Sequence, residues 1–374
     1  MAKVSIVLGL GFGDEGKGVT VAHLVSHSKL PLVIRFNGGH QAGHTVVKDG
    51  VKHIHSTYGS GALYGAPTYV SEFCTFDPLA AHNEWKELKR KGVTPPRLII
   101  HPDCPVVTPW DGEVQRIYAA HYNHGTVGVG FGYTLNRHFD NHYRLCARDL
   151  RYPNVLLTKL KLIYNSYGAG AALTPLEEVL AAFYDSDVDG FYKVGLPDAD
   201  KYEHHIYEGA QGIMLDQDFG YFPHVTRSFC TSRNAMEMLT TDPHKAEIYL
   251  VTRAYATRHG AGPLIHEEKG KDLQLVNTDG ETNVSHPYQG EFRKAPLSVN
   301  QLKYAIECEQ SITYTMVDRK QYRLVVTCLD QVGGYIPDVN GEEVTPQKLS
   351  RELGFKSVLA NFSPEGQFVE YEHS

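Results

Sequence analysis

Residues 11–18, with the sequence GFGDEGKG, have the composition of a phosphate-binding loop. They match the pattern Gly-x-x-x-x-Gly-Lys and lie between an apolar run and a stretch that can continue as a helix. Glycines let backbone N–H groups curl around phosphate oxygens, and Lys17 adds a positive charge. Gly18 stands where a magnesium-binding Ser or Thr is usual, so we expect Asp14 to supply an oxygen ligand instead. The bare pattern also fits a glycine-rich turn with a solvated acidic pair.

A second loop, residues 35–45 with the sequence RFNGGHQAGHT, follows the next apolar run. In a parallel sheet it opens on the same edge as the first loop, so the two loops can face each other. His40 and His44 would share a face of a helix, but the glycines argue against a regular helix and no third ligand is evident. We therefore expect a catalytic or phosphate-contacting histidine here rather than a transition-metal site.

Short apolar runs alternate with stretches of helical periodicity along the chain. The runs predict strands near 4–8, 32–36, 97–101, 205–207, 247–253 and 322–329, and the periodicity predicts helices near 79–90, 176–184 and 299–307. This alternation predicts an α/β fold with a large, mostly parallel central sheet and a P-loop-like nucleotide site. Because no repeat or long linker interrupts it, we expect residues 1–374 to form a single domain with insertions.

The composition narrows the classes of partner. The chain of 374 residues carries 36 basic and 43 acidic residues, a net charge of −7, without the basic stripe that a nucleic-acid backbone requires. No run of about 18 apolar residues exists, so we expect no membrane partner and a cytoplasmic location. Six widely spaced cysteines are typical of reduced thiols. The 20 histidines are unusual.

Together the two loops resemble those of the adenylosuccinate synthetase family. Three later segments appear in the family's order: EGAQG at 208–212 leading to PHVT at 223–226, TRHGAGP at 257–263, and TCLD at 327–330. The resemblance runs from about residue 4 to 330. It implies an enzyme that joins L-aspartate to C6 of IMP, using a nucleoside triphosphate and Mg²⁺, through a 6-phosphoryl intermediate.

The resemblance also assigns roles to residues. Asp14 would remove the N1 proton of the purine, His44 would assist phosphoryl transfer to O6, and Gln211 would hold the 6-substituent, which makes these three the expected catalytic residues. Mg²⁺ would be held by Asp14 and the Gly43 carbonyl. The expected donor-nucleotide residues are Gly13, Glu15, Gly16, Lys17, Gly18, Thr45 and Asp330; the expected purine-monophosphate residues are Gln41, Thr126, Gln211, Thr226 and His259.

Departures from the family pattern leave the substrates open. Its arginine-rich aspartate loop reads NVSHPYQGEFRK at 283–294, where Arg293 is the expected aspartate clamp. Asp330 can still read guanine, but Cys328 replaces a lysine of the donor-reading segment, so the donor is GTP or ATP. Residues 363–366 stand where the family contacts the donor base, and the tail from 363 to 374 is expected to be a surface extension.

Two alternatives follow from these departures. Val127 stands where the family has a second threonine, so one hydroxyl contact to the monophosphate is lost. The chain is also short, like archaeal and phage-encoded relatives. The phage relatives act on dGMP, which would place this protein in a host cytoplasm, whereas the retained Asp14 favours IMP. The family is dimeric, so we expect a homodimer, with Arg137 as the candidate that reaches the partner subunit. A catalytically inactive nucleotide-binding paralogue is the other alternative, although it would have no reason to keep Lys17 and His44.

Overall fold

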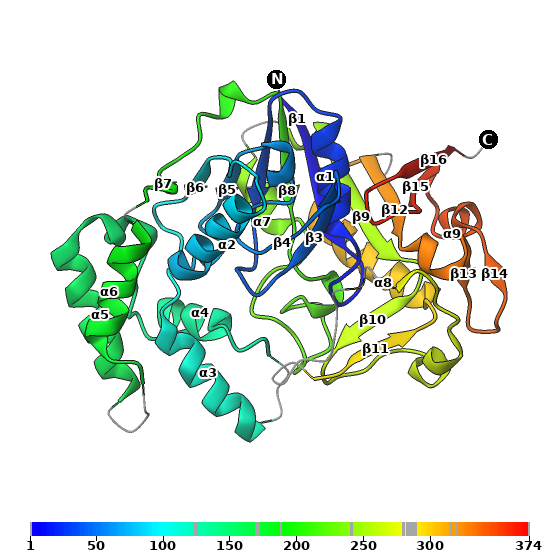
Figure 1. The fold of residues 1–374 in the computed structure, drawn as a ribbon. Coiled ribbons are helices and arrows are strands. Elements are labelled where there is room, and N and C mark those ends of the chain that lie inside the picture. The colour runs from blue at the N-terminus through cyan, green and yellow to red at the C-terminus, as the bar shows by residue number, and fades with distance from the viewer. Residues whose placement is uncertain are drawn as a thin grey trace.

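A ten-stranded sheet organises the computed structural model (Figure 1), which describes residues 2–122, 126–168, 173–187, 189–239, 242–278, 281, 290–314, 316–318 and 321–372. Every neighbouring pair of strands is parallel except β15 and β16 at one edge. The predicted α/β class with a large, mostly parallel sheet is therefore confirmed. Across the sheet the strands are β16 (Phe368–Glu372), β15 (Ser357–Asn361), β12 (Tyr322–Thr327), β9 (Ala246–Arg253), β1 (Lys3–Gly9), β8 (His204–Glu208), β2 (Pro31–Arg35), β5 (Thr68–Val70), β6 (Leu98–Ile100) and β7 (Tyr192–Val194).

Three small two-stranded sheets and the helices surround the main sheet. The small sheets are β3 (His44–Lys48) with β4 (Val51–His55), β10 (Ala256–His259) with β11 (Phe292–Ala295), and β13 (Ile336–Pro337) with β14 (Glu343–Val344). The helices are α1 (Lys17–Ser26), α2 (Pro78–Arg90), α3 (Pro109–Tyr122), α4 (Phe131–Phe139), α5 (Pro153–Tyr167), α6 (Leu176–Asp187), α7 (Arg233–Met238), α8 (Val299–Thr313) and α9 (Pro346–Glu352). Within the described ranges, no helix is long and apolar enough to cross a membrane.

Strand β1 shows why the sheet is covered on both faces. Side chains alternate along a strand, so Ile6 and Leu8 point to one face, where Leu302 of α8 joins their apolar cluster. Val7 points to the other face and packs with Val21 of α1. Both faces are apolar, which is why this strand reads as a continuous hydrophobic run in the sequence.

The order of the central strands brings distant loops to one edge. Strands β12, β9, β1, β8 and β2 are consecutive and parallel, so their C-terminal ends lie side by side. The loops after β1 and β2 are separated only by β8, as the sequence predicts for two loops that face each other. The site forms at this edge.

The structure corrects two expectations at the boundaries. The strand expected over 322–329 ends at Thr327, because Cys328 has a φ of 58° and begins a short 3₁₀ turn at Leu329–Val332. The tail expected as a surface extension contains β16, which pairs antiparallel with β15 over five residues. The single-domain organisation stays a prediction.

Candidate active site

A buried carboxylate shapes the glycine-rich loop. Glu15 Oε1 accepts hydrogen bonds from the backbone N–H of Gly11 at 3.0 Å and of Gly13 at 2.7 Å. Its other oxygen, Oε2, lies 2.6 Å from Lys17 Nζ, and both side chains are almost fully buried. The φ values of Gly13 and Gly16, 97° and 89°, suit glycine. Glu15 therefore holds the loop and Lys17 in place.

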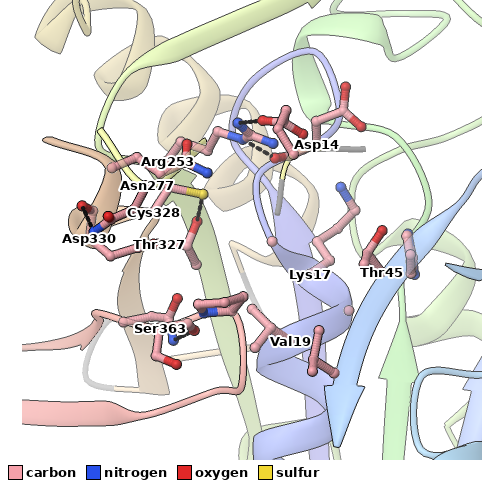
Figure 2. A pocket seen from close by; sticks show the side chains of 18 of the residues that line it. Asp14, Lys17, Val19, Thr45, Arg253, Asn277, Thr327, Cys328, Asp330 and Ser363 are labelled. Carbon is pink, nitrogen blue, oxygen red and sulfur yellow. Dashed lines mark hydrogen bonds and ion pairs between the residues drawn. The ribbon is translucent and has the colours of Figure 1, made fainter. Parts of the chain in front are cut away.

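Beyond this loop lies a cavity of ≈ 400 Å³, here called the Lys17 cavity, which Figure 2 shows from close by. Lys17 and Thr45 line it on one side, and Cys328 and Asp330 line it on another. The structure brings together here eight of the residues assigned to catalysis, the donor nucleotide or the metal: Asp14, Gly16, Lys17, Gly18, Gly43, His44, Thr45 and Asp330. Ser363 and Pro364 also line the cavity.

Asp14 lies where β1, β9 and β10 approach each other. Its Oδ2 is 3.3 Å from His259 Nε2, and Arg253 Nε donates to its backbone carbonyl. Burial raises the pKa of Asp14, but the hydrogen bond from His259 and the charges of Arg253 and Lys17 outweigh it and hold this pKa below its ordinary value. Asp14 is thus ionised at neutral pH and can accept a proton or bind a cation.

His44 forms a buried pair with Glu208, the last residue of β8. His44 Nδ1 lies 2.5 Å from Glu208 Oε1, and Ser60 N–H donates to Glu208 Oε2 at 3.0 Å. Burial raises the pKa of Glu208, but His44 and Arg35 outweigh it and bring this pKa to about 2. Burial also lowers the pKa of His44 more than Glu208 raises it. A neutral His44 that donates Nδ1–H to Glu208 keeps Nε2 for a ligand.

A second cavity of ≈ 680 Å³, here called the Gln211 cavity, contains all five residues assigned to the purine monophosphate: Gln41, Thr126, Gln211, Thr226 and His259. Gln211 Nε2 donates to Thr226 Oγ1 at 3.0 Å. Gln41 has both polar side-chain atoms buried without a hydrogen-bond partner among the described residues. Such a group is costly unless a ligand satisfies it. The His259–Asp14 contact joins this cavity to the Lys17 cavity.

Some predicted residues lie elsewhere. Gly13 and Glu15 do not line the Lys17 cavity. Arg293 lines neither cavity and binds Glu267 at 2.7 Å as well as backbone carbonyls of the 260–262 loop. Residues 283–289 of the expected aspartate loop fall outside the described residues. The prediction that Arg137 reaches a partner subunit is wrong, because its side chain is only 2% exposed and its guanidinium is bound to Asp111 of the same chain.

Sequence reasoning missed two residues of the site. Glu208 directly precedes the Gly-Ala-Gln-Gly segment, and Arg253 is the last residue of a predicted strand. Both positions are strand ends on the edge where the loops gather, which was the available signal. Asp216, which lies between the 208–212 and 223–226 segments, has a structural role, because its carboxylate accepts backbone N–H bonds from Asp218 and Cys230.

The sequence of this chain is similar to the sequences of adenylosuccinate synthetases. The family model for adenylosuccinate synthetase matches residues 6–310. The adenylosuccinate synthetase of Methylibium petroleiphilum is 32% identical over 279 residues, which cover 69% of this chain and 62% of the relative. That of Desulfotalea psychrophila is 32% identical over 296 residues, which cover 72% and 66%. The chain thus spans less than two thirds of the length of these relatives.

Two solved structures share the fold at low sequence identity. The fully ligated adenylosuccinate synthetase of Plasmodium falciparum has a TM-score of 0.71 and 19% identity, and the match covers 100% of both chains. The succinoaminodeoxyadenylate synthetase of cyanophage S-2L, bound to dGMP and dATP, has a TM-score of 0.66 and 16% identity, covering 100% of this chain and 95% of that one. On the family model and the sequence relatives together, the chain belongs to the adenylosuccinate synthetase family.

Proposed function

We propose that this protein is a carbon–nitrogen ligase that joins L-aspartate to C6 of IMP at the expense of a nucleoside triphosphate. The observation that carries the proposal is the meeting of two cavities at the Asp14–His259 contact. One cavity offers a lysine and a helix N-terminus suited to phosphates, and the other offers amide and hydroxyl groups suited to a purine monophosphate. A reaction between two nucleotides requires such adjoining sites.

Asp14 is the proposed general base. A 6-oxo group becomes a nucleophile for the γ-phosphate only when the N1 proton is removed, and Asp14 is the ionised carboxylate at the junction of the cavities. Gln211, which already donates to Thr226, can turn its amide to the 6-substituent. The unpaired amide of Gln41 supports a monophosphate contact in the same cavity.

His44 is the proposed donor to the phosphate oxygens and O6 during transfer. Glu208 accepts the Nδ1–H, so His44 can donate from Nε2 into the Lys17 cavity only as an imidazolium, the form that the Glu208 carboxylate favours. As negative charge develops on the transferred group, an imidazole beside an ionised carboxylate can take up positive character. Glu208 is therefore a positioning residue rather than a group that touches substrate.

The family implies Mg²⁺, and the residues present fit it. Asp14 is an ionised carboxylate and Gly43 has a backbone carbonyl, and both line the Lys17 cavity, so they would hold the ion with phosphate oxygens. Bound there, Mg²⁺ would neutralise charge on the donor phosphates. Lys17 supplies a further positive charge, kept in place by Glu15.

Arg293 is the proposed aspartate clamp. Its guanidinium now binds Glu267, whose side chain is 43% exposed, and it lies beside the loop that follows His259. A substrate carboxylate carries the same charge as the Glu267 carboxylate, so it can replace that carboxylate at Arg293 Nη1. Both carboxylates compete for one cation, so aspartate binding requires Glu267 to move away.

A dGMP-specific enzyme of the phage type is the second candidate. Neither Arg293 nor Lys294 lines the Gln211 cavity, so within the described part of the chain this segment offers no partner for a ribose 2′-hydroxyl. The cyanophage structure that shares the fold binds dGMP and dATP. Retention of Asp14 still favours IMP, because a carboxylate there leaves less room for a guanine 2-amino group.

The donor nucleotide, the oligomeric state and the cellular location are the remaining parts of the proposed function. Asp330 and Ser363 line the far part of the Lys17 cavity, where they can contact the base of GTP or ATP (Figure 2). We propose a homodimer, which sedimentation at several concentrations tests by its mass. The expected partners are small molecules, without nucleic acid or membrane, and the cytoplasmic location stays a prediction.

A substrate panel tests the function. IMP, dIMP, GMP and dGMP are each incubated with aspartate and Mg²⁺ and with either GTP or ATP, and the aspartyl product is followed by mass spectrometry. IMP is expected to give the adduct. Use of dGMP alone would replace the first candidate by the second, and triphosphate hydrolysis without any adduct would contradict both.

A further inference from the structure

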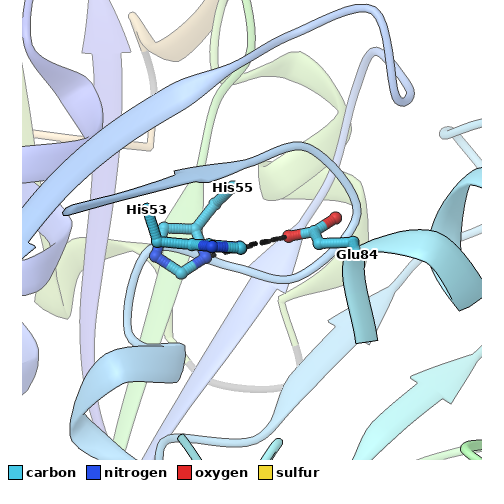
Figure 3. Close-up of side chains that lie close together, drawn as sticks. All are labelled: His53, His55 and Glu84. Atoms are coloured by element: carbon cyan, nitrogen blue, oxygen red, sulfur yellow. Dashed lines mark ion pairs between the residues drawn. The ribbon is translucent and has the colours of Figure 1, made fainter. Parts of the chain in front are cut away.

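A buried cluster of His53, His55 and Glu84 lies outside both cavities (Figure 3). His53 and His55 are two residues apart on β4, so they share one face of the strand. Glu84 comes from the middle of α2 and faces them. The three residues are 2%, 0% and 9% exposed. Among the described residues this is the one group of three or more potential metal ligands whose donor atoms lie within 4.8 Å of one another.

Three of the four ring nitrogens of this cluster lack a hydrogen-bond partner among the described residues. His53 Nε2 lies 3.5 Å and His55 Nδ1 lies 3.8 Å from Glu84 Oε1, both too far for good hydrogen bonds. His53 Nε2 and both ring nitrogens of His55 are buried and have no hydrogen-bond partner among the described residues. Leaving buried polar atoms unpaired destabilises the folded protein. A bound ion would satisfy these nitrogens together.

From this arrangement we infer a binding site for a divalent transition-metal ion of the zinc class, held by His53, His55 and Glu84. Two imidazoles and one carboxylate are a ligand set that such ions prefer, with water in the fourth position. Ligands of a tetrahedral Zn²⁺ lie about 3.3 Å apart, as follows from metal–ligand distances of ~2.0–2.1 Å. The observed spacings of 3.5 and 3.8 Å need only a small inward movement.

The surroundings hold the carboxylate in position. Glu84 Oε2 accepts from Thr57 N–H at 2.7 Å, and Oε1 accepts from Ser56 N–H at 3.2 Å. Such outer contacts orient a metal ligand. One contact opposes the site: Lys91 Nζ lies 3.3 Å from His53 Nδ1. When Nε2 binds a metal, Nδ1 must carry the proton, so Lys91 would retain only its bonds to the Lys52 carbonyl and Glu87.

The site connects to the catalytic strand. In the β3–β4 hairpin His55 is directly opposite His44. A metal that ties β4 to α2 would therefore fix the strand pair from which His44 reaches the Lys17 cavity. The site also gives a role to two of the 20 histidines.

Metal binding is tested on untagged, full-length protein without nucleotides. After chelator treatment, Zn²⁺ is titrated in the presence of excess Mg²⁺. The amount of metal bound per chain is then measured by inductively coupled plasma mass spectrometry. We expect one Zn²⁺ per chain, a higher melting temperature, and slower hydrogen exchange in residues 44–55. His53→Gln should abolish all three effects.

The matched control is His27→Gln. His23 and His27 form another histidine pair, on and just after α1, with ring centroids 4.4 Å apart and an exposed His27 that could bind metal adventitiously. His27→Gln should leave Zn²⁺ binding unchanged. The inference is overturned if His27→Gln removes the metal and His53→Gln does not, or if wild-type protein binds no stoichiometric Zn²⁺.

If His53→Gln does not fold, the visible absorption spectrum of the Co²⁺-loaded wild-type protein tests the ligand set instead. Co²⁺ bound to wild-type protein by nitrogen and oxygen ligands in a tetrahedral site gives visible d–d bands without the sulfur-to-metal charge-transfer band of a thiolate. These bands, displaced by one equivalent of Zn²⁺, support the site. A charge-transfer band would instead implicate a thiol such as Cys328, the one cysteine that is not fully buried, and would contradict the inference.

Discussion

Glu208→Gln tests the proposed role of the carboxylate behind His44. The substitution removes one negative charge with little change in shape, at a position where the carboxylate contacts His44 Nδ1 at 2.5 Å and Ser60 N–H at 3.0 Å. The amide oxygen can still accept a hydrogen bond from His44. The variant should therefore fold and bind nucleotides, but its His44 lacks a counter-ion when positive charge develops.

The expected loss follows from the strength of the contact. A hydrogen bond to a charged group contributes ~1.5–3 kcal/mol, so kcat should fall by about 10- to 150-fold. The loss should lie in kcat rather than KM, because the contact strengthens as the phosphoryl group moves. Glu208 raises the pKa of His44 against the effect of burial. Removing the Glu208 charge should therefore lower the pKa of His44. In a plot of kcat against pH, the part that depends on protonated His44 should shift toward lower pH.

Steady-state rates of aspartate-dependent phosphate release, measured across pH, provide the assay. Ser60→Ala is the control, because Ser60 Oγ donates to the same carboxylate and its removal leaves the charge. That variant should lose little activity and keep the wild-type pH limb. A Glu208→Gln enzyme with a kcat near that of wild type, or with a pure KM effect, would refute the reasoning.

Three further predictions concern the substrates and the stability. Asp14→Asn should depress turnover by roughly two decades or more while nucleotide binding stays within a few-fold in calorimetry, and near-normal turnover would remove Asp14 from the mechanism. Arg293→Leu should raise the aspartate KM by about ten- to a hundredfold and leave the purine KM unchanged, whereas Glu267→Gln should lower the aspartate KM; changes in the same direction would contradict the clamp. Burial raises the pKa of Glu309 to about 7. Ionisation of this buried group therefore lowers the free energy of unfolding by about 3 kcal/mol, and this loss develops as the pH rises from about 4.5 to 7. Glu309→Gln keeps the bonds to Ser232 and should raise the melting temperature at about pH 8 but hardly at about pH 5; an equal gain at both would refute the assignment.

The sequence predicted six of the ten strands in the sheet, namely β1, β2, β6, β8, β9 and β12, because strands buried on both faces appear as apolar runs. It also predicted that the loops after β1 and β2 would face each other, because parallel strands end on one edge. The β3–β4 hairpin was missed although its signal is present. Asp49-Gly50 separates two alternating segments, and both residues have positive φ, 49° and 75°, as a hairpin turn of this type requires.

Other features could not be predicted because they depend on contacts between distant residues. Glu208 meets His44 across 164 positions of the chain, and no local pattern links them. Glu15 matched the phosphate-loop motif and was assigned to the donor, but the loop closes around its side chain, which binds Lys17 and two backbone N–H groups. Arg137 was expected at the subunit interface from its position in the sequence, but its guanidinium forms an ion pair with Asp111 of the same chain.

The central claim is that the 6-oxo group is phosphorylated before aspartate displaces it. The direct measurement uses the 6-oxopurine monophosphate selected by the substrate panel, labelled with oxygen-18 at C6, together with the triphosphate, Mg²⁺ and aspartate. If Asp14 and His44 act at the junction of the two cavities as proposed, each aspartyl product formed releases phosphate that carries one oxygen-18 atom, which mass spectrometry detects. Unlabelled phosphate accompanying the aspartyl product would contradict the account.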